Sequence, residues 1–369
     1  MKPLKLSLSS ALLASAVCVP AAFAQEADTQ IEEEAQGTPP TFLAAPKVVD
    51  LGGGVTLDFY GYIKADFIKD YDFDLGDTTS GLIRIGLPNG APPGENTREH
   101  LRETRIGFNV ERDDLFAKFE GDFFGGDSFE LRLRHAYVSY AGVMIGQNWM
   151  HWMSVDNLAR TNDFQGPVGL PFARLPQLRY TWDNGSGLFL SGAIEEDPIS
   201  DNDVFVSLAA KKEYDWGFLR AAGMWRDTDV NQTRINGWGL NLSSVVTPWQ
   251  NGKIKANFVT GNGTVDLLTD GWSGVSVYDG DEVPYNAFTV SIEQKFLEDF
   301  AVGAAYGRST VDRASGSETK RLETVHITGW YEATDNIRFG LEYFNGKRHQ
   351  GDGASFDAGR VQFSSVITF

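Results

Sequence analysis

The sequence predicts an all-β protein, a 16-stranded antiparallel transmembrane β-barrel with an inward-folded third extracellular loop. The composition is rich in glycine and aromatic residues, with 40 Gly, 25 Phe, 12 Tyr and 9 Trp but only 14 Pro, which is typical of β proteins. Apolar and polar residues alternate along segments of about ten residues, the length of a bilayer-crossing strand. No stretch after residue 25 stays apolar over about 18 residues, as a membrane-spanning helix requires. If the chain spans a membrane it must therefore form a closed barrel, because only a barrel pairs every backbone group without a helix.

Residues 1–24 have the pattern of a secretory signal peptide. Two lysines precede an apolar run, and the segment ends on the small-residue cleavage pattern AFA. A lipoprotein signal that modifies Cys18 is the alternative, although the preceding Val17 is larger than the residues usual at that position. Because Cys18 is the only cysteine, the mature chain is expected to contain no disulfide bond.

The rest of the chain divides into two parts. Residues 25–50 are acidic and contain Pro39, Pro40 and Pro46, so they are predicted to form a solvated periplasmic extension. Residues 51–369 are predicted to form the barrel. An exported barrel is expected in the outer membrane of a Gram-negative bacterium.

Each predicted strand presents one apolar and one polar face. In the first strand, Phe59, Ile63 and Phe67 share one face, whereas Tyr60 and Lys64 lie on the other. The same alternation recurs in sixteen segments, at 55–68, 105–110, 115–123, 131–140, 142–149, 177–183, 188–195, 203–214, 217–225, 235–246, 253–261, 286–296, 301–309, 322–333, 336–344 and 359–369. An even number of strands places both ends of the barrel on one side.

The links between these segments alternate in length. Tight, turn-like links occur at 112–114, 141–142, 183–186, 214–216, 248–252, 297–299 and 334–336, and the links between them include long ones at 71–96, 149–174, 263–283, 311–320 and 346–354. The tight turns therefore fall on the side of the termini and the long loops on the other. A soluble β-sandwich has no reason to sort its loops in this way.

The chain ends on an alternating strand whose last residue is Phe369. A strand that runs to the last residue must be held in a sheet, because free termini fray. This strand is therefore predicted to close the barrel against the first one. A terminal aromatic residue on a lipid-facing strand also resembles the signal by which the barrel-assembly machinery identifies its clients, so this machinery is an expected partner through Phe369.

A barrel of this size encloses an aqueous lumen, and diffusion of small solutes is its default function. The net charge of −18 suggests a cation-preferring pore. Much of the acid, however, is expected in solvated segments: the N-terminal extension, the first loop with DYDFDLGD, the fourth loop with Glu195 and Asp197, and the sixth loop. DYDFDLGD resembles half a calcium loop, but Leu75 stands where the EF-hand pattern needs Gly.

Basic side chains are predicted to line the lumen. The phase of the strands directs five of them inward, namely Lys64, Arg105, Arg132, Arg134 and Arg179. The third loop, which is long enough to fold into the lumen and narrow it, adds Arg160 and Arg174. Guanidinium groups bind carboxylates through forked hydrogen bonds. These seven residues form the predicted pore-lining, substrate-facing set.

Two further interpretations of these residues stay open. Each lumen arginine can instead hold the wall together by pairing with a nearby acid, for which the candidates are Glu103, Glu120, Asp122 and Glu130. Arg102 is out of phase with Arg105, so it is not included in the set. Four aromatic residues, Trp149, Trp152, Phe164 and Phe172, either pack the third loop against the wall or contact the solute.

Enzymatic chemistry is not predicted. The five His residues are scattered, and no H-E-x-x-H, G-x-S-x-G or Cys cluster occurs. We expect no cofactor, no metal and no nucleic-acid partner.

Four segments resemble the DcaP-like porins of Gram-negative outer membranes: GYIKADF, LRETRIGF, LRLRHAYVSYAGVMIGQNW and the terminal VITF. The resemblance covers nearly all of residues 55–369. It implies a sixteen-stranded homotrimeric channel that favours small anions, dicarboxylates in particular, with arginines at the constriction.

The leading hypothesis is an outer-membrane porin for passive diffusion of small anionic solutes, dicarboxylates in particular, through an arginine-lined constriction. A phosphate-type or general diffusion porin is the alternative, and a structural or adhesive barrel with a plugged lumen is the alternative of a different class. The chain is expected to form a homotrimer with two further copies, joined through the first and last strands. Its other expected partners are the anionic solutes, outer-membrane lipid and lipopolysaccharide.

Overall fold

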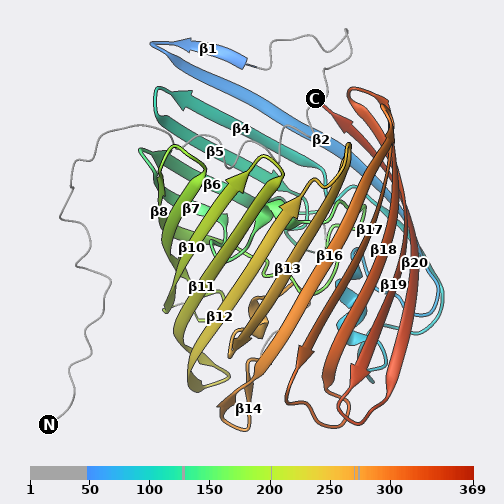
Figure 1. Cartoon of the computed structure of the whole chain (residues 1–369). Helices are drawn as coiled ribbons and strands as arrows, with labels where there is room; N and C mark the ends of the chain where they lie inside the picture. The colour runs from blue at the N-terminus through green and yellow to red at the C-terminus, as the bar shows by residue number, and fades with distance from the viewer. Residues whose placement is uncertain (1–47, 127–128, 201, 270, 273–274) are drawn as a thin grey trace, which may run out of the picture.

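The computed structural model describes residues 48–126, 129–200, 202–269, 271–272 and 275–369. These residues form an antiparallel sheet that closes on itself into a barrel (Figure 1). The predicted signal peptide, and the predicted extension up to residue 47, lie outside the described residues. No helix in the described part of the chain is long and apolar enough to cross a membrane.

The sheet contains 18 strands, two of which, β1 (Val48–Gly52) and β3 (Asn96–His100), are short strands paired with β2. The remaining 16 form the antiparallel barrel. They are β2 (Val55–Asp70), β4 (Arg105–Arg112), β5 (Leu115–Asp122), β6 (Arg132–Tyr140), β7 (Val143–Trp149), β8 (Arg174–Asp183), β9 (Leu188–Glu196), β10 (Val204–Tyr214), β11 (Gly217–Val230), β12 (Thr233–Val246), β13 (Gly252–Asn262), β16 (Pro284–Leu297), β17 (Phe300–Val311), β18 (Thr319–Thr334), β19 (Ile337–Gln350) and β20 (Ser355–Thr368).

The terminal strand closes the barrel, as predicted. β20 pairs with β2 from Tyr62↔Thr368 to Asp70↔Arg360, and the Phe369 N–H donates to the Gly61 carbonyl at 3.0 Å. All sixteen predicted strands are present. β18 and β19 run further toward the long-loop end than the alternation indicated, so the last two loops shorten to residues 312–318 and 351–354.

The two faces of the barrel differ sharply in polarity. Large apolar side chains are exposed on the outer face, for example Ile145 at 62%, Leu208 at 73% and Leu341 at 58%. Polar and charged side chains are buried on the inner face, including the fully buried Arg348. This arrangement is inverted relative to a soluble protein and fits an apolar solvent outside and water inside.

Three loops pack together inside the long-loop end of the barrel. They carry the 3-10 helices η3 (Thr79–Arg84), η4 (Val155–Asn157) and η5 (Val265–Leu267), and the sixth loop also contains a small hairpin of β14 (Val277–Tyr278) and β15 (Asp281–Glu282). Their apolar residues form a buried cluster that includes Leu75, Leu82, Trp152, Leu267 and Trp272. Two contacts between loops fix it: Phe172 N–H donates to Leu267 O at 3.0 Å, and the Thr79 hydroxyl to Asp163 at 2.7 Å.

Two acids of the first-loop segment, Asp70 and Asp77, are paired with arginines and not simply solvated as predicted, whereas Asp72 is exposed. Asp70 is fully buried and accepts two hydrogen bonds from Arg360, at 2.7 and 3.0 Å. Asp77 accepts hydrogen bonds from Arg98 and Arg102. Burial raises the pKa of Asp77, but the two arginine hydrogen bonds outweigh it, so its pKa lies below the usual value. Asp70 and Arg360 are distant in sequence, and only closure of the barrel by β2 and β20 brings them together.

Glu195 and Asp197 also depart from the prediction of solvated loop acid. Glu195 lies in β9 and is fully buried, and Asp197 is buried beside Arg226. Among the described residues no group of three or more His, Cys, Asp or Glu is arranged to hold a metal ion.

Candidate functional site: a basic strip beside the third loop

The third long loop, residues 150–173, lies against inward-facing residues of distant strands. The Asn157 amide donates to Ser244 O at 2.8 Å and thereby reaches β12. Asn162 N–H donates to Glu342 of β19 at 2.7 Å. Because the loop starts after β7 and contacts strands on the far side, it crosses the lumen.

The wall is shaped to receive this loop. A Cβ at Gly340 would overlap Asn162, and a Cβ at Gly239 would overlap the Trp152 ring. Glycine at these two positions therefore allows the loop to approach the strands closely.

The start of the loop is held by a polar network. His151 N–H donates to Glu195 at 2.7 Å, and the His151 ring lies between the hydroxyls of Ser207 at 2.7 Å and Ser191 at 2.6 Å. Arg179 donates to Trp149 O at 2.6 Å, and Arg220 donates to His151 O. Burial lowers the pKa of His151 well below its usual value, and the two arginines lower it further. The ring is therefore neutral at pH 7.

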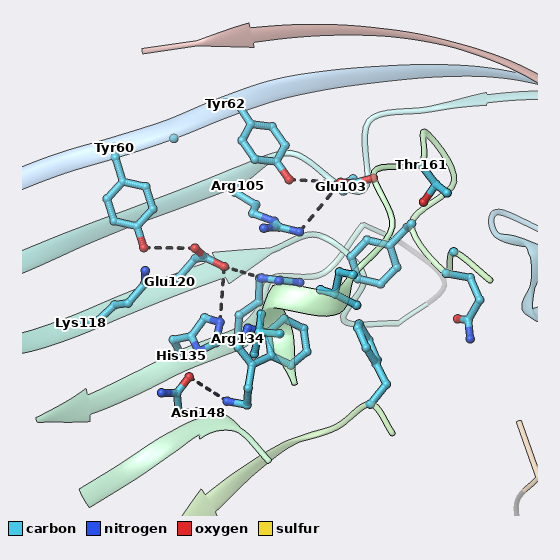
Figure 2. Close-up of a pocket in the computed structure, with 18 of the residues that line it drawn as sticks. Tyr60, Tyr62, Glu103, Arg105, Lys118, Glu120, Arg134, His135, Asn148 and Thr161 are labelled. Atoms are coloured by element: carbon cyan, nitrogen blue, oxygen red, sulfur yellow. Dashed lines mark hydrogen bonds and ion pairs between the residues drawn. The ribbon is translucent and has the colours of Figure 1, made fainter. Parts of the chain in front are cut away.

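A cavity of about 290 Å³ lies between the loop and the wall formed by β2 and β4–β7. Its wall side includes Tyr60, Tyr62, Arg105, Glu120 and Arg134, and Figure 2 shows these side chains converging from neighbouring strands. The loop side includes Thr161 and Phe164. The cavity is the part of the lumen that the packed loops leave open on this side.

Arg134 is a wall residue that is fully paired. Its side chain is 1% exposed and contacts Glu120 and, at 2.9 Å, Asp122. A bulge in the pairing of β5 with β6, between Glu120 and Gly121, turns both Arg134 and His135 toward the lumen. Arg134 therefore holds the wall together by pairing with nearby acids, which was the alternative interpretation, although its side chain also lines the cavity.

The side chains of Arg132 and Arg105 are more exposed than those of their acidic partners. Arg132 binds Asp122 through two hydrogen bonds of 2.9 and 2.6 Å, and its side chain is 33% exposed while that of Asp122 is 0% exposed. Arg105 is 24% exposed, and its Nη2 lies 3.9 Å from Glu103, which is 13% exposed. The Arg105 Nε has no hydrogen-bond partner among the described residues. Arg105 lines the cavity together with Arg134 and the acids Asp58, Glu103, Glu120 and Asp163, whereas Arg132 is not among the lining residues.

Lys64 lies at the edge of the basic strip that Arg105, Arg132 and Arg134 form, but its side chain is only 6% exposed. It contacts Glu103 and donates to Asn162 O of the third loop at 2.6 Å. Its role in the structure is to join the wall to the loop.

The three remaining predicted residues occupy separate places. Arg160 pairs with Glu332 on the far wall and lies over the Trp330 ring at 4.6 Å. Arg174, the first residue of β8, lies 4.5 Å from the Trp149 ring centre, and its Nη1 is buried without a hydrogen-bond partner in the described chain. Arg179 holds the start of the loop. The structure thus brings Arg105, Arg132 and Arg134 together and places Arg160 apart from them.

Aromatic rings separate the arginines of the strip. The Arg132 guanidinium lies 5.6 Å and that of Arg134 5.7 Å from the Phe164 ring centre. Arg134 also lies 5.6 Å from Trp149. Phe164, Trp149 and Phe172 line the cavity, whereas Trp152 is fully buried in the loop cluster. Both interpretations of the aromatic set therefore apply, but to different members.

Five residues at or near this site were not part of the predicted set. Tyr60, Tyr62 and Lys118 line the cavity, and their inward phase on β2 and β5 was available from the alternation. Arg220 also has an inward phase, but its contact with His151 requires the fold. Arg102 contacts Asp77 and lies 5.0 Å from the Phe124 ring centre, from a segment between β3 and β4 where strand phase does not apply.

Comparison with solved structures identifies the architecture. The outer membrane channel DcaP of Acinetobacter baumannii aligns over 87% of this chain and 99% of its own, with a TM-score of 0.76 and 22% identity. The fold is that of the outer-membrane porins. The chain also aligns with OmpT of Vibrio cholerae, with a TM-score of 0.61 and 12% identity over 87% of this chain and 100% of that one. It aligns likewise with an anion-selective porin from Comamonas acidovorans, with a TM-score of 0.59 and 12% identity over 85% of this chain and 100% of that one. No protein-family model and no curated protein matches the chain.

Proposed function

We propose that the chain is an outer-membrane porin through which small anionic solutes diffuse passively, with dicarboxylates as the preferred class. One observation supports the selectivity: on the β4–β6 wall the side chains of Arg105 and Arg132 are 24% and 33% exposed, while those of their partners Glu103 and Asp122 are 13% and 0% exposed. The sign of the charge nearest to the solute sets the selectivity at a constriction.

The position of the charges matters more than their sum. Coulomb interactions with exposed charges beyond about 10 Å are screened at 0.1 M salt. Acids distant from the cavity, such as Asp203, Asp227 and Asp229 around Arg234, therefore contribute little at the constriction. The net charge of −18 thus does not set the preference.

A dicarboxylate fits this strip better than a monovalent anion does. Arg105 and Phe164 line the cavity, and the Arg132 guanidinium lies 5.6 Å from the Phe164 ring centre. Two guanidinium groups are thus offered to the two carboxylates, with an apolar ring beside one of them. The remaining bonds to Glu103 and Asp122 weaken each guanidinium as a ligand. Weak binding, on the order of millimolar, is what a conducting pore needs in order to release its solute.

The membrane placement follows from the outer face. The apolar outer side chains fit a bilayer, and an outer-membrane barrel carries its short turns on the periplasmic side and its long loops outside. Here the short turns lie at the end that holds the C-terminus (Figure 1). The residues before β1 are accordingly assigned to the periplasm after removal of residues 1–24. Phe369 follows β20 and packs beside Gly61, and it is 38% exposed, so the assembly machinery is proposed to recognise it there.

We further propose a homotrimer, joined through the outer faces of the first and last barrel strands. Ala65 and Ser365 are small outward residues there that allow close approach between copies, whereas Gly61, which was expected to contribute as well, is buried beneath the Phe369 ring. A detergent-solubilised mass equal to one barrel, under conditions that preserve porin trimers, would count against this assignment.

Current through purified protein in a planar lipid bilayer tests the proposal. We expect ohmic current whose reversal potential in a potassium chloride gradient shows that chloride permeates more readily than potassium. Millimolar succinate is expected to block this current in part. Absence of current would favour a plugged barrel, for which the packed first, third and sixth loops are the structural argument. Current without ion preference would instead favour a general porin, and block by phosphate but not succinate a phosphate-type one.

A further inference from the structure

A basic group lies on the outer face of the barrel, away from the lumen, at the long-loop end of β17–β19. Its members are Arg308, Arg321, Lys347 and His349. Their neighbours along the strands, Ser309, Leu322 and Arg348, are fully buried on the inner side. Because side chains alternate across a strand, the four basic side chains point outward.

The register brings these residues together. Arg308 is opposite Glu323, and Glu323 is opposite Lys347. Arg321 is opposite His349, so it is a diagonal neighbour of both Arg308 and Lys347, at about 7–8 Å between Cα atoms. The group therefore forms one compact patch around Glu323.

The cations of the patch exceed its acids. Glu323 accepts from Tyr306 at 2.9 Å and contacts His349 at 2.8 Å and Arg321 at 3.2 Å. Lys347 pairs with Asp357 at 3.1 Å. Arg308 makes no ion pair within the described chain, and its Nε donates only to the Thr310 hydroxyl, at 3.4 Å.

Directly toward the middle of the barrel, the same outer face becomes apolar. Val325, Ile327, Leu341 and Tyr343 are 37%, 50%, 58% and 48% exposed. A cationic patch at the rim of an apolar band matches a molecule with an anionic head and hydrocarbon chains.

Elsewhere on the same long-loop rim, around β11 and β12, the balance of charge is acidic. On β12, Arg234 is surrounded by Asp203 at 2.9 Å, Asp227 at 2.7 Å and Asp229 at 3.4 Å. Its charge is thus more than compensated. The basic patch is therefore a local feature and not a property of the whole rim.

We propose that Arg308, Arg321 and Lys347 bind the phosphate group of an outer-leaflet glycolipid whose acyl chains lie along Val325, Ile327 and Leu341. The site rests on the outer-membrane placement proposed above but not on the anion selectivity. Its ligand is a membrane lipid and not free phosphate, because the apolar surface is continuous with the patch.

Native mass spectrometry of the full chain in detergent, with diphosphorylated lipid A added, tests the site. Wild type and the matched control Arg234→Ala are expected to retain the lipid equally. The variant with Arg308→Ala, Arg321→Ala and Lys347→Ala is expected to bind it on the order of a hundredfold more weakly, at about fivefold for each charge removed. Dephosphorylated lipid should bind all three proteins alike.

Equal retention by the triple variant and wild type would overturn the proposal. Displacement of the lipid by millimolar inorganic phosphate would show a free-phosphate site, and a smaller oligomer in the triple variant would show a contact between copies; either result also overturns it. Channel current is measured on the same samples and is expected to be unchanged, so a failure of the porin assignment is seen separately.

Discussion

Replacement of Arg105 by alanine should reduce the anion preference of the channel with little loss of stability. Arg105 points into the cavity, its acidic contact is a long one of 3.9 Å to Glu103, and Lys64 also contacts Glu103. Removal of its guanidinium therefore leaves Glu103 paired. The change removes one cation from the lumen without leaving a buried acid alone.

The size of the effect follows from Coulomb's law. At about 5 Å, a unit charge changes the energy of a monovalent ion by about 0.8 kcal/mol in water, and by about 0.5 kcal/mol after screening at 0.1 M salt. Anions lose an attraction and cations lose a repulsion, so the permeability ratio changes by about 1 kcal/mol, or about fivefold.

The reversal potential in a potassium chloride gradient measures this ratio directly. Arg313→Ala is a matched control, because Arg313 lies in an exposed loop and pairs with Asp281 at 2.8 Å. We expect the Arg105→Ala potential to move toward zero and that of the control to stay at the wild-type value. A wild-type channel that prefers cations, or an Arg105 variant with an unchanged potential, would refute the argument from exposed guanidinium groups.

Three further outcomes are expected. Arg134→Ala should lower the free energy of unfolding by about 3–5 kcal/mol, because it removes the ion pair of the buried Glu120, whereas Asp122 keeps Arg132; thermal denaturation checks this, and an unchanged melting temperature would contradict it. Anion preference should fall between 0.1 and 1 M salt, because the Debye length shrinks from about 10 Å to about 3 Å; a preference independent of salt in reversal-potential measurements would exclude the electrostatic origin. The His151 ring, which faces Arg179, Arg220 and Glu195, has a lowered pKa in the folded state, so its contribution to stability is complete above the unfolded pKa of about 6.5 and is lost as pH falls below it, by up to about 1.4 kcal/mol per pH unit. The melting temperature should therefore fall more steeply from pH 7 to pH 5 in wild type than in His151→Asn, and parallel curves would contradict this.

The sequence by itself determined the strands, their order and which face of each strand is apolar. Period-two alternation is a local property of the chain, so segments such as 55–68 and 359–369 could be assigned, and the lumen phase of Arg105, Arg132 and Arg179 followed from it.

Only the tertiary structure decided which charges remain available to a solute. The pairing of Arg134 with both Glu120 and Asp122 depends on a bulge, and a bulge shifts the phase without a clear sign in the alternation. The pairing of Asp70 with Arg360 joins the first and last strands, and the anchoring of Asn162 on Glu342 requires the loop to cross the lumen. These contacts are set by cross-strand register and barrel closure, which depend on the whole chain and not on any one segment of it.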